Sequence, residues 1–192
     1  MMDSMRYIAG SDVSWAFGHV TQDGRDATLD DARHGGEEIG LLGSADFVDS
    51  APVPMDQIAA YLNFDMVGRM RDNRLTVQAL GSSSIWPDLV DEVNASFNFD
   101  LQPVNDPYLP TDSRSLNQAG VPTLALFTGS HEDYHRPTDD ADTVNYVDLE
   151  RVARYGAAVA ARLARESEPP DFVRAERSGQ EGGQMAIRIF TG

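Results

Sequence analysis

Apolar residues occur along the chain in short blocks that predict a small set of β-strands. The mostly apolar run over 58–67, which ends before Gly68, has the length and composition of a buried strand. The segment 75–80 alternates apolar and polar positions and is closed by Gly81, which predicts a second strand. A third strand is predicted over 122–128, where the run is again mostly apolar.

Helices are predicted before, between and after these strands. Apolar and small residues recur at helical spacing over 39–48, and an apolar face predicts a helix over 84–97. A short helix is predicted over 111–119, with Gly120 as its C-cap. Capping of that helix is enough to explain the presence of Asp112 and Ser113.

The clearest helical pattern follows Asp148, which is predicted to be the N-cap of a long helix. Val147 and Val152 have the spacing of a hydrophobic staple across that cap. The Glu-Pro-Pro sequence at 168–170 is expected to end the helix. The apolar positions at helical spacing, which lie opposite a row of arginines, are Leu149, Val152, Gly156, Val159 and Leu163.

Strands that alternate with helices predict an α/β domain with a largely parallel sheet. Ligands of such sheets bind at the carboxyl ends of the strands. The residues best suited to chemistry lie at or near such ends: Asp65, the polar loop from Thr128 to His135, and the pair Glu37 and Glu38.

Composition and charge exclude several classes of function. The chain has 192 residues, enough for one domain with its own core, and no apolar run long enough to span a bilayer. Because it contains no cysteine, a metal site must use His, Asp and Glu. The net charge of -16 repels nucleic acid and anionic membranes, so neither is expected as a partner. The N-terminus does not have the pattern of a signal peptide.

Glu37 and Glu38 stand between glycines and an apolar segment. On a turn that leaves a strand, the two carboxylates can converge, so that one holds a metal ion and the other accepts a proton from water. The alternative is a helix N-terminus, where acidic side chains suit the helix dipole. The pair by itself favours the helix N-terminus.

Asp65 follows a predicted buried strand, and a buried carboxylate needs a partner because burying an unpaired charge is costly. A metal ion would serve, and so would a salt bridge to Arg69 or Arg71. The sequence leaves both alternatives open.

The segment from His131 to His135 spells a two-histidine zinc motif, which requires a helix so that both histidines share one face. Gly129 before the motif and Pro137 after it predict a loop instead. One of the two histidines is therefore a better candidate ligand than the pair.

The order and spacing of these motifs together resemble the co-catalytic zinc aminopeptidase family (metallopeptidase family twenty-eight). The resemblance covers roughly residues 35–168 and is carried by the segments 36–44, 63–68, 111–113 and 134–140. It implies a zinc-exopeptidase fold, a three-layer α/β sandwich with a largely parallel mixed sheet. It also implies two zinc ions and a peptide substrate.

The resemblance assigns a role to each candidate residue. Glu37 would be the general base, and Glu38 and His135 would ligate one zinc ion. Asp65 would ligate the other zinc ion. Tyr108 resembles a tyrosine that stabilises the developing oxyanion of the substrate. Asp112 would contact a zinc ligand and not the zinc ion itself.

Residues 1–35 depart from the family pattern. Upstream of the glutamate pair, the family has a His-x-Asp motif and a further aspartate that bridges both zinc ions, and residues 1–35 contain neither. We therefore expect at most one zinc ion to bind well, and weak or absent peptidase activity. Residues 1–35 are interpreted as a misread or truncated segment with the N-terminal strands missing or altered. Residues 36–168 are interpreted as a partial catalytic domain, and 169–192 as a linker and the start of a truncated β-rich domain.

Two other functions stay open from the sequence. One is a single-zinc acyltransferase resembling the glutaminyl cyclases, and the other is a binding domain with a relict site. The retained residues Glu38, Asp65 and His135 count against a relict site, because drift would remove ligands in scattered places. Side-chain specificity, oligomeric state and compartment are not predicted, although bacterial members of the family are often exported.

Overall fold

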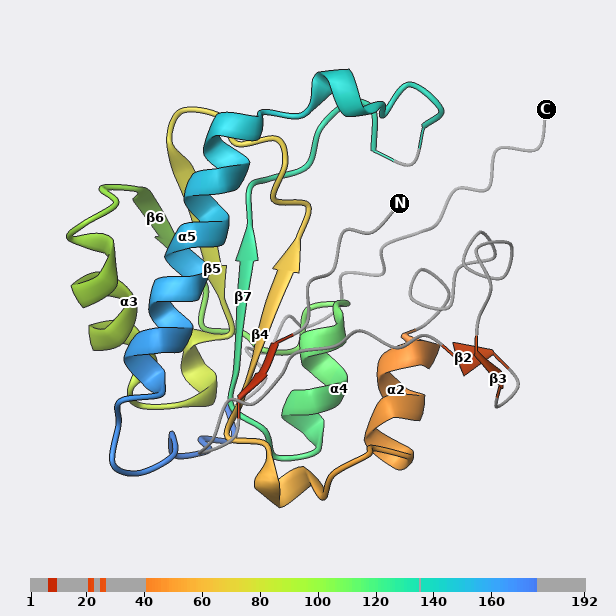
Figure 1. Ribbon diagram of the computed structural model, residues 1–192, viewed down its shortest axis with the longest axis vertical. Coiled ribbons are helices and arrows are strands. Elements are labelled where there is room, and N and C mark those ends of the chain that lie inside the picture. The colour runs from red at the N-terminus through yellow and green to blue at the C-terminus, as the bar shows by residue number, and fades with distance from the viewer. Residues whose placement is uncertain (1–6, 10–20, 23–24, 27–40, 135, 176–192) are drawn as a thin grey trace, which may run out of the picture.

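The computed structural model describes residues 7–9, 21–22, 25–26, 41–134 and 136–175. Its centre is a five-stranded sheet in the order β1-β4-β7-β5-β6 (Figure 1). A separate two-stranded ladder pairs β2 (Thr21–Gln22) with β3 (Arg25–Asp26). The strands of the main sheet are β1 (Tyr7–Ala9), β4 (Ala60–Asp65), β7 (Thr123–Phe127), β5 (Arg74–Gln78) and β6 (Asp100–Pro103).

The sheet is mixed, and two of its four pairings are parallel. β4 runs parallel to β7, and β5 runs parallel to β6. β5 is antiparallel to β7, and β1 is antiparallel to β4. The carboxyl ends of β4 and β7 therefore lie together at one end of the sheet, as the arrows in Figure 1 show. The carboxyl ends of β5 and β6 lie at the opposite end.

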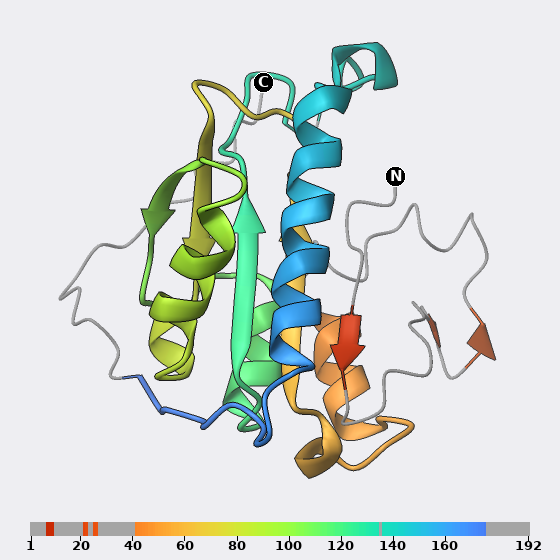
Figure 2. The same cartoon turned by 60° about the vertical axis from the view of Figure 1, so that its left-hand side comes forward.

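Helices cover both faces of the sheet and give three layers (Figure 2). One face carries α3 (Trp86–Asn94) and α5 (Tyr146–Leu163), and the other carries α2 (Leu42–Asp49) and α4 (Asp112–Gln118). Single turns of 3-10 helix are η1 (Met55–Gln57), η2 (Leu80–Ser82) and η3 (Ala141–Thr143). The predicted α/β fold with a mixed sheet is confirmed.

Successive residues of β4 face opposite sides, and each side has its own apolar cluster. Leu62 and Phe64 join the larger cluster under α3 and α5, together with the buried Trp86 and Tyr155. Tyr61 joins a smaller cluster with Ile58, Leu116 and Val121, against which Phe47 and Val48 of α2 pack. Asp65 has the same parity as Tyr61, so its side chain belongs to the α2 and α4 face.

The strands predicted over 58–67, 75–80 and 122–128 are confirmed as β4, β5 and β7. The helices predicted over 39–48, 84–97 and 111–119 are confirmed as α2, α3 and α4. Gly120 has a φ of 90°, the left-handed backbone expected of a glycine that follows a helix. The short strand β1 lies outside the three predicted strands and adds to the edge of the sheet beside β4.

The start and end of α5 correct the prediction for the long helix. Its N-cap is Asn145, whose side chain accepts a hydrogen bond from the amide of Asp148, so Asp148 lies within the first turn. The Asn145 amide group in turn donates to Asp148 Oδ2 at 2.7 Å, and this reciprocal contact fixes the helix start three residues before Asp148. Val147 is 73% exposed, so the predicted staple with Val152 is wrong. The helix ends at Leu163, before the Glu-Pro-Pro sequence.

After α5 the chain passes back across one end of the sheet. The Asp171 carboxylate accepts hydrogen bonds from the hydroxyls of Ser83 and Ser84 and from the Ser84 amide, at 2.7–3.0 Å. These bonds, led by that from Ser83, hold the pKa of Asp171 below its ordinary value. The Val173 amide donates to the carbonyl of Ser82, whose hydroxyl donates to Thr123 at the start of β7. Residues 171–173 thus lie at the end of the sheet opposite Asp65.

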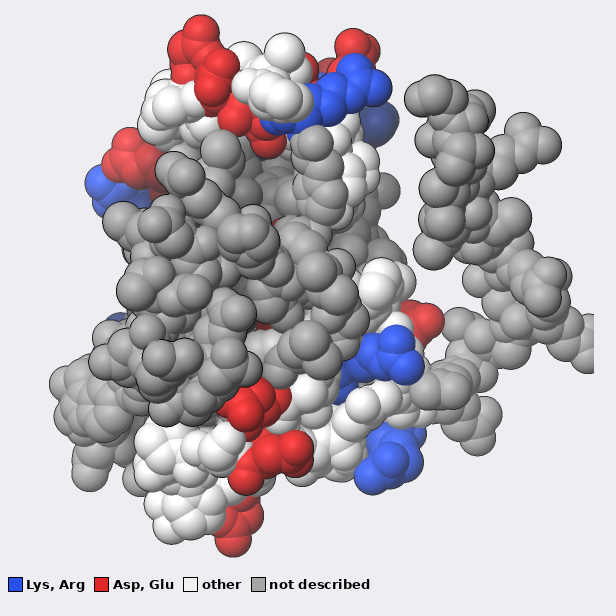
Figure 3. Space-filling model, turned by 90° about the vertical axis from the view of Figure 1, so that its right-hand side faces the viewer, with Lys and Arg blue, Asp and Glu red and all other residues white. Residues whose placement is uncertain are grey.

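No helix in the described part of the chain is long and apolar enough to cross a membrane. The surface in Figure 3 carries acidic and arginine side chains on its described parts. Although the net charge of the chain is strongly negative, arginine side chains lie among the acidic ones on the described parts of this face.

Candidate functional site

Asp65 is the last residue of β4, and its backbone lies beside Phe127, the last residue of β7. The carboxylate is half-buried, in contrast to the fully buried residues that precede it in the strand. Its position at the shared carboxyl end of two parallel strands is where α/β sheets bind ligands.

The chain turns sharply after Asp65. Met66 has a φ of 49°, a left-handed conformation that is uncommon for a residue other than glycine. The Thr128 hydroxyl donates to the Met66 carbonyl at 2.5 Å, and the Arg69 amide donates to the Thr128 hydroxyl at 3.4 Å. These bonds join the turn after β4 to the first residue after β7. Unusual backbone held by such contacts is typical of functional sites.

The segment that follows Thr128 is a loop, as predicted. Residues 132–134 form a turn, in which the Tyr134 amide donates to the His131 carbonyl, and no helix covers 131–134. The two-histidine motif is therefore not presented on a helix in the described part of this segment. His131 is largely buried, with its ring edge against Tyr134 and its Nε2 3.7 Å from Asp139 Oδ2.

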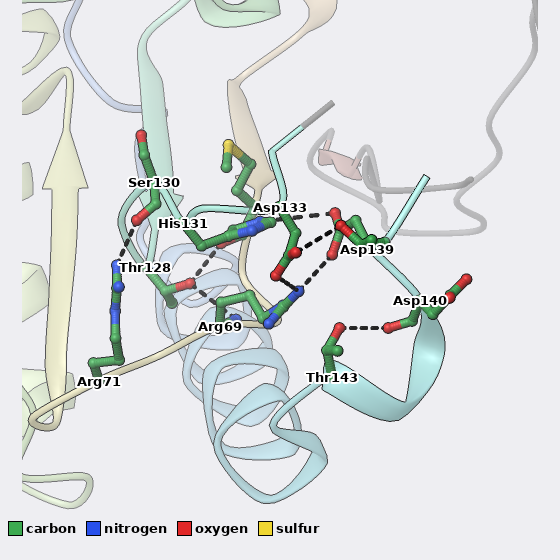
Figure 4. Close-up of polar contacts among 11 residues, drawn as sticks. Arg69, Arg71, Thr128, Ser130, His131, Asp133, Asp139, Asp140 and Thr143 are labelled. Carbon is green, nitrogen blue, oxygen red and sulfur yellow. Dashed lines mark hydrogen bonds and ion pairs between the residues drawn. The ribbon is translucent and has the colours of Figure 1, made fainter. Parts of the chain in front are cut away.

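Arg69 binds this loop rather than Asp65. Its Nη2 atom lies 3.2 Å from Asp133 Oδ2 and 2.7 Å from Asp139 Oδ1 (Figure 4). Arg71, the other arginine considered as a partner of Asp65, donates to the Ser130 carbonyl. The contacts described for the two arginines are therefore with residues of this loop and not with Asp65.

Asp112 and Ser113 begin α4, but neither is its N-cap. The N-cap position belongs to Thr111, and no side chain caps it by a hydrogen bond. Asp112 is 6% exposed and Ser113 is 2% exposed, so both side chains point into the protein. A carboxylate in the first turn is stabilised by the helix dipole. Ser115 of the same helix shares a 2.9 Å hydrogen bond with Ser44 of α2, which joins the two helices of this face.

Tyr108 is half-buried, and its hydroxyl donates to the carbonyl of Ala175 at 3.0 Å. Ala175 lies two residues after Val173, whose amide donates to Ser82 at the end of the sheet opposite Asp65. The hydroxyl therefore has a structural partner in the C-terminal segment.

Removing this hydroxyl in Tyr108→Phe is expected to lower the free energy of unfolding by about 1 kcal/mol, the ordinary value of one net hydrogen bond. Urea unfolding measures the change. Tyr146→Phe is the matched control, because the Tyr146 hydroxyl also donates to a backbone carbonyl, that of Ala141, but is exposed. Unchanged stability with a lower kcat would instead assign the Tyr108 hydroxyl to the substrate oxyanion.

Three of the predicted site residues, Glu37, Glu38 and His135, lie outside the described residues. Among the residues that are described, no group of three or more His, Cys, Asp or Glu side chains could hold a metal ion. The described chain resumes at residue 41, three residues after Glu38, and includes the residues on both sides of position 135. α2 begins at Leu42 on the sheet face to which Asp65 belongs, and the loop on both sides of residue 135 is fixed at the carboxyl end of β7.

The sequence matches the model of Peptidase family M28 over residues 20–160. This match includes residues 20–35, upstream of the segment that carries the motif resemblance. No curated protein matches the chain.

The fold is similar to those of several solved aminopeptidases. The LapA aminopeptidase of Legionella pneumophila matches with a TM-score of 0.59 and 24% identity, over 69% of this chain and 38% of that one. BSAP, a zinc aminopeptidase from Bacillus subtilis, matches with a TM-score of 0.55 and 23% identity, over 72% and 37%. An aminopeptidase from Aneurinibacillus sp. strain AM-1 matches with a TM-score of 0.56 and 22% identity, over 73% and 35%. The matched region thus spans little more than a third of each of these proteins.

Proposed function

Because this chain belongs to peptidase family M28, we propose that its site is that of a zinc-dependent metallopeptidase of the aminopeptidase type. The observation that carries the proposal is the position of Asp65. It ends β4 beside the end of β7, and the loop that follows β7 leads to His135. A carboxylate at the end of β4 and an imidazole from the segment after β7 would suit zinc in a protein without cysteine.

We assign the ligands to Glu38, Asp65 and His135, with Glu37 as the general base. Zinc at this position would polarise the scissile carbonyl and lower the pKa of water. Glu37 would accept the proton of the attacking water and return it to the leaving amine. Peptides with a free N-terminus are the proposed substrates. At most one zinc ion is expected to bind well, because residues 1–35 lack the His-x-Asp motif.

The experiment is a long incubation of the purified chain with an aminoacyl anilide and zinc. The expected result is slow release of the aniline above the buffer rate, removed by a chelator. Glu37→Gln should lower the rate about 10²- to 10⁴-fold, the usual contribution of a general base, with zinc content unchanged.

Glu150→Gln is the control, because Glu150 is an exposed residue of α5 paired with Arg154. It should leave the rate unchanged. A complete lack of chelator-sensitive release would overturn the peptidase proposal for this chain. Ammonia release from a peptide with N-terminal glutamine, without anilide cleavage, would assign the site to an acyltransferase instead.

A further inference from the structure

We propose that Arg69 is a positioning residue that fixes the loop around His135 relative to Asp65, and so sets the zinc affinity of the site. The inference rests on the proposed function for its metal. The positioning itself rests on contacts of the described residues.

The contacts of Arg69 lie on both sides of residue 135. One guanidinium nitrogen bonds Asp133, two residues before it, and Asp139, four residues after it. The Arg69 side chain is 18% exposed, so both ion pairs are partly shielded from water. Dashed lines in Figure 4 join the guanidinium to both carboxylates. A single side chain thus holds both ends of the segment 133–139.

The segment 133–139 is also bonded to itself. The Thr138 hydroxyl donates to Asp133 Oδ1 at 2.7 Å, so each oxygen of that carboxylate has a partner. The Arg136 amide donates to the Asp133 carbonyl, and the Asp139 amide donates to the Arg136 carbonyl. The described residues on the two sides of position 135 are therefore bonded to one another as well as to Arg69.

Arg69 stands four residues after Asp65, within the turn that Thr128 joins to β7. Its anchoring point is thus part of the backbone that places Asp65, and its partners belong to the segment that contains His135. The hydrogen bond from Thr138, and then that from Arg69, lowers the pKa of Asp133. The pairing with Asp139 raises the pKa of Arg69.

A metal site loses affinity when its ligands must be ordered at the moment of binding. Groups that orient ligands from behind typically account for about 10- to 100-fold in metal affinity. Arg69 is 64 residues from Asp133 and 70 residues from Asp139 in the sequence. Its ion pairs therefore join the segment after Asp65 to the segment around position 135.

The test measures the zinc dissociation constant of the whole chain by competition with a chromophoric chelator. Arg69→Met is expected to raise it about 10- to 100-fold. Arg69→Lys keeps the charge but not the planar fork, so a smaller rise is expected, and this variant serves if Arg69→Met does not fold. Arg74→Met is the matched control, because Arg74 at the start of β5 forms an exposed ion pair with Asp100 at the start of β6.

Hydrogen exchange of the amides over 131–139 is the second readout. Faster exchange in both Arg69 variants, but not in Arg74→Met, supports the positioning role. Loss of thermal stability with unchanged zinc affinity and unchanged exchange would overturn it and leave Arg69 a purely structural residue. If the unmodified chain binds no zinc, the proposed function fails, and the exchange rates alone decide whether Arg69 positions the loop.

Discussion

Alanine at Glu38 or at His135 is expected to reduce the zinc content of the dialysed chain from near stoichiometric to near zero. Each change removes one of three assigned protein ligands, and two ligands are too few for a zinc site in a protein. Metal analysis of the two variants beside the unmodified chain measures the effect. Circular dichroism of each variant checks that the loss of zinc is not a loss of the fold.

Two control variants distinguish this site from the helical two-histidine zinc motif that residues 131–135 match in sequence. Glu132→Ala changes an exposed loop carboxylate, and His131→Ala removes the first histidine of the motif. Both should keep most of the zinc, because residues 131–134 form a turn and not a helix. If His131→Ala loses as much zinc as His135→Ala, the present ligand assignment is wrong. Absence of zinc from the unmodified chain would mean that the upstream ligands are indispensable.

Gly156→Ala is expected to destabilise the fold by about 2 kcal/mol. A Cβ at this position of α5 would lie 2.2 Å from Phe64 Cζ and 2.4 Å from Cε1. Phe64 is 6% exposed, so its ring has little room to move. Overpacking a core at this level costs about 3 kcal/mol, and the better helix propensity of alanine returns about 1 kcal/mol. The midpoint of urea unfolding measures the difference.

Gly43→Ala in α2 is the matched control for that substitution. A Cβ on Gly43 meets nothing within 4 Å, so only the helix propensity changes. A gain of up to about 1 kcal/mol is expected. If the two substitutions changed the stability equally, the close approach of α5 to β4 would not be the reason for glycine at position 156.

The central strands could be predicted because buried strands have a mostly apolar local sequence. β4 and β7 are buried along nearly their whole length, and such strands give continuous apolar runs. β6 was missed because its residues, Asp-Leu-Gln-Pro, are mostly exposed and it lies at the sheet edge. It is held by pairing with β5, which a local pattern does not encode. The start of α5 was misplaced because Asn145 and Asp148 are both good cap residues and only their mutual hydrogen bonds select Asn145.

The candidate site was predicted from motifs and not from contacts. Asp65 lies at a strand end as expected, while the assignments of Glu37, Glu38 and His135 stay predictions. Arg69 was considered as a partner of Asp65 because it is near in sequence. Its ion pairs instead reach Asp133 and Asp139, which no local spacing indicates.

The exposed strand β6 has a consequence for self-association. An edge strand offers unpaired backbone groups to other chains, and long apolar edges promote aggregation. β6 has four residues, begins with the charged Asp100 and ends with Pro103, which lacks an amide hydrogen. Its mostly exposed side chains offer little apolar surface to an incoming strand. We therefore expect this edge to resist addition of a further strand even at high protein concentration, and substitutions such as Asp100→Val and Pro103→Val to remove that protection.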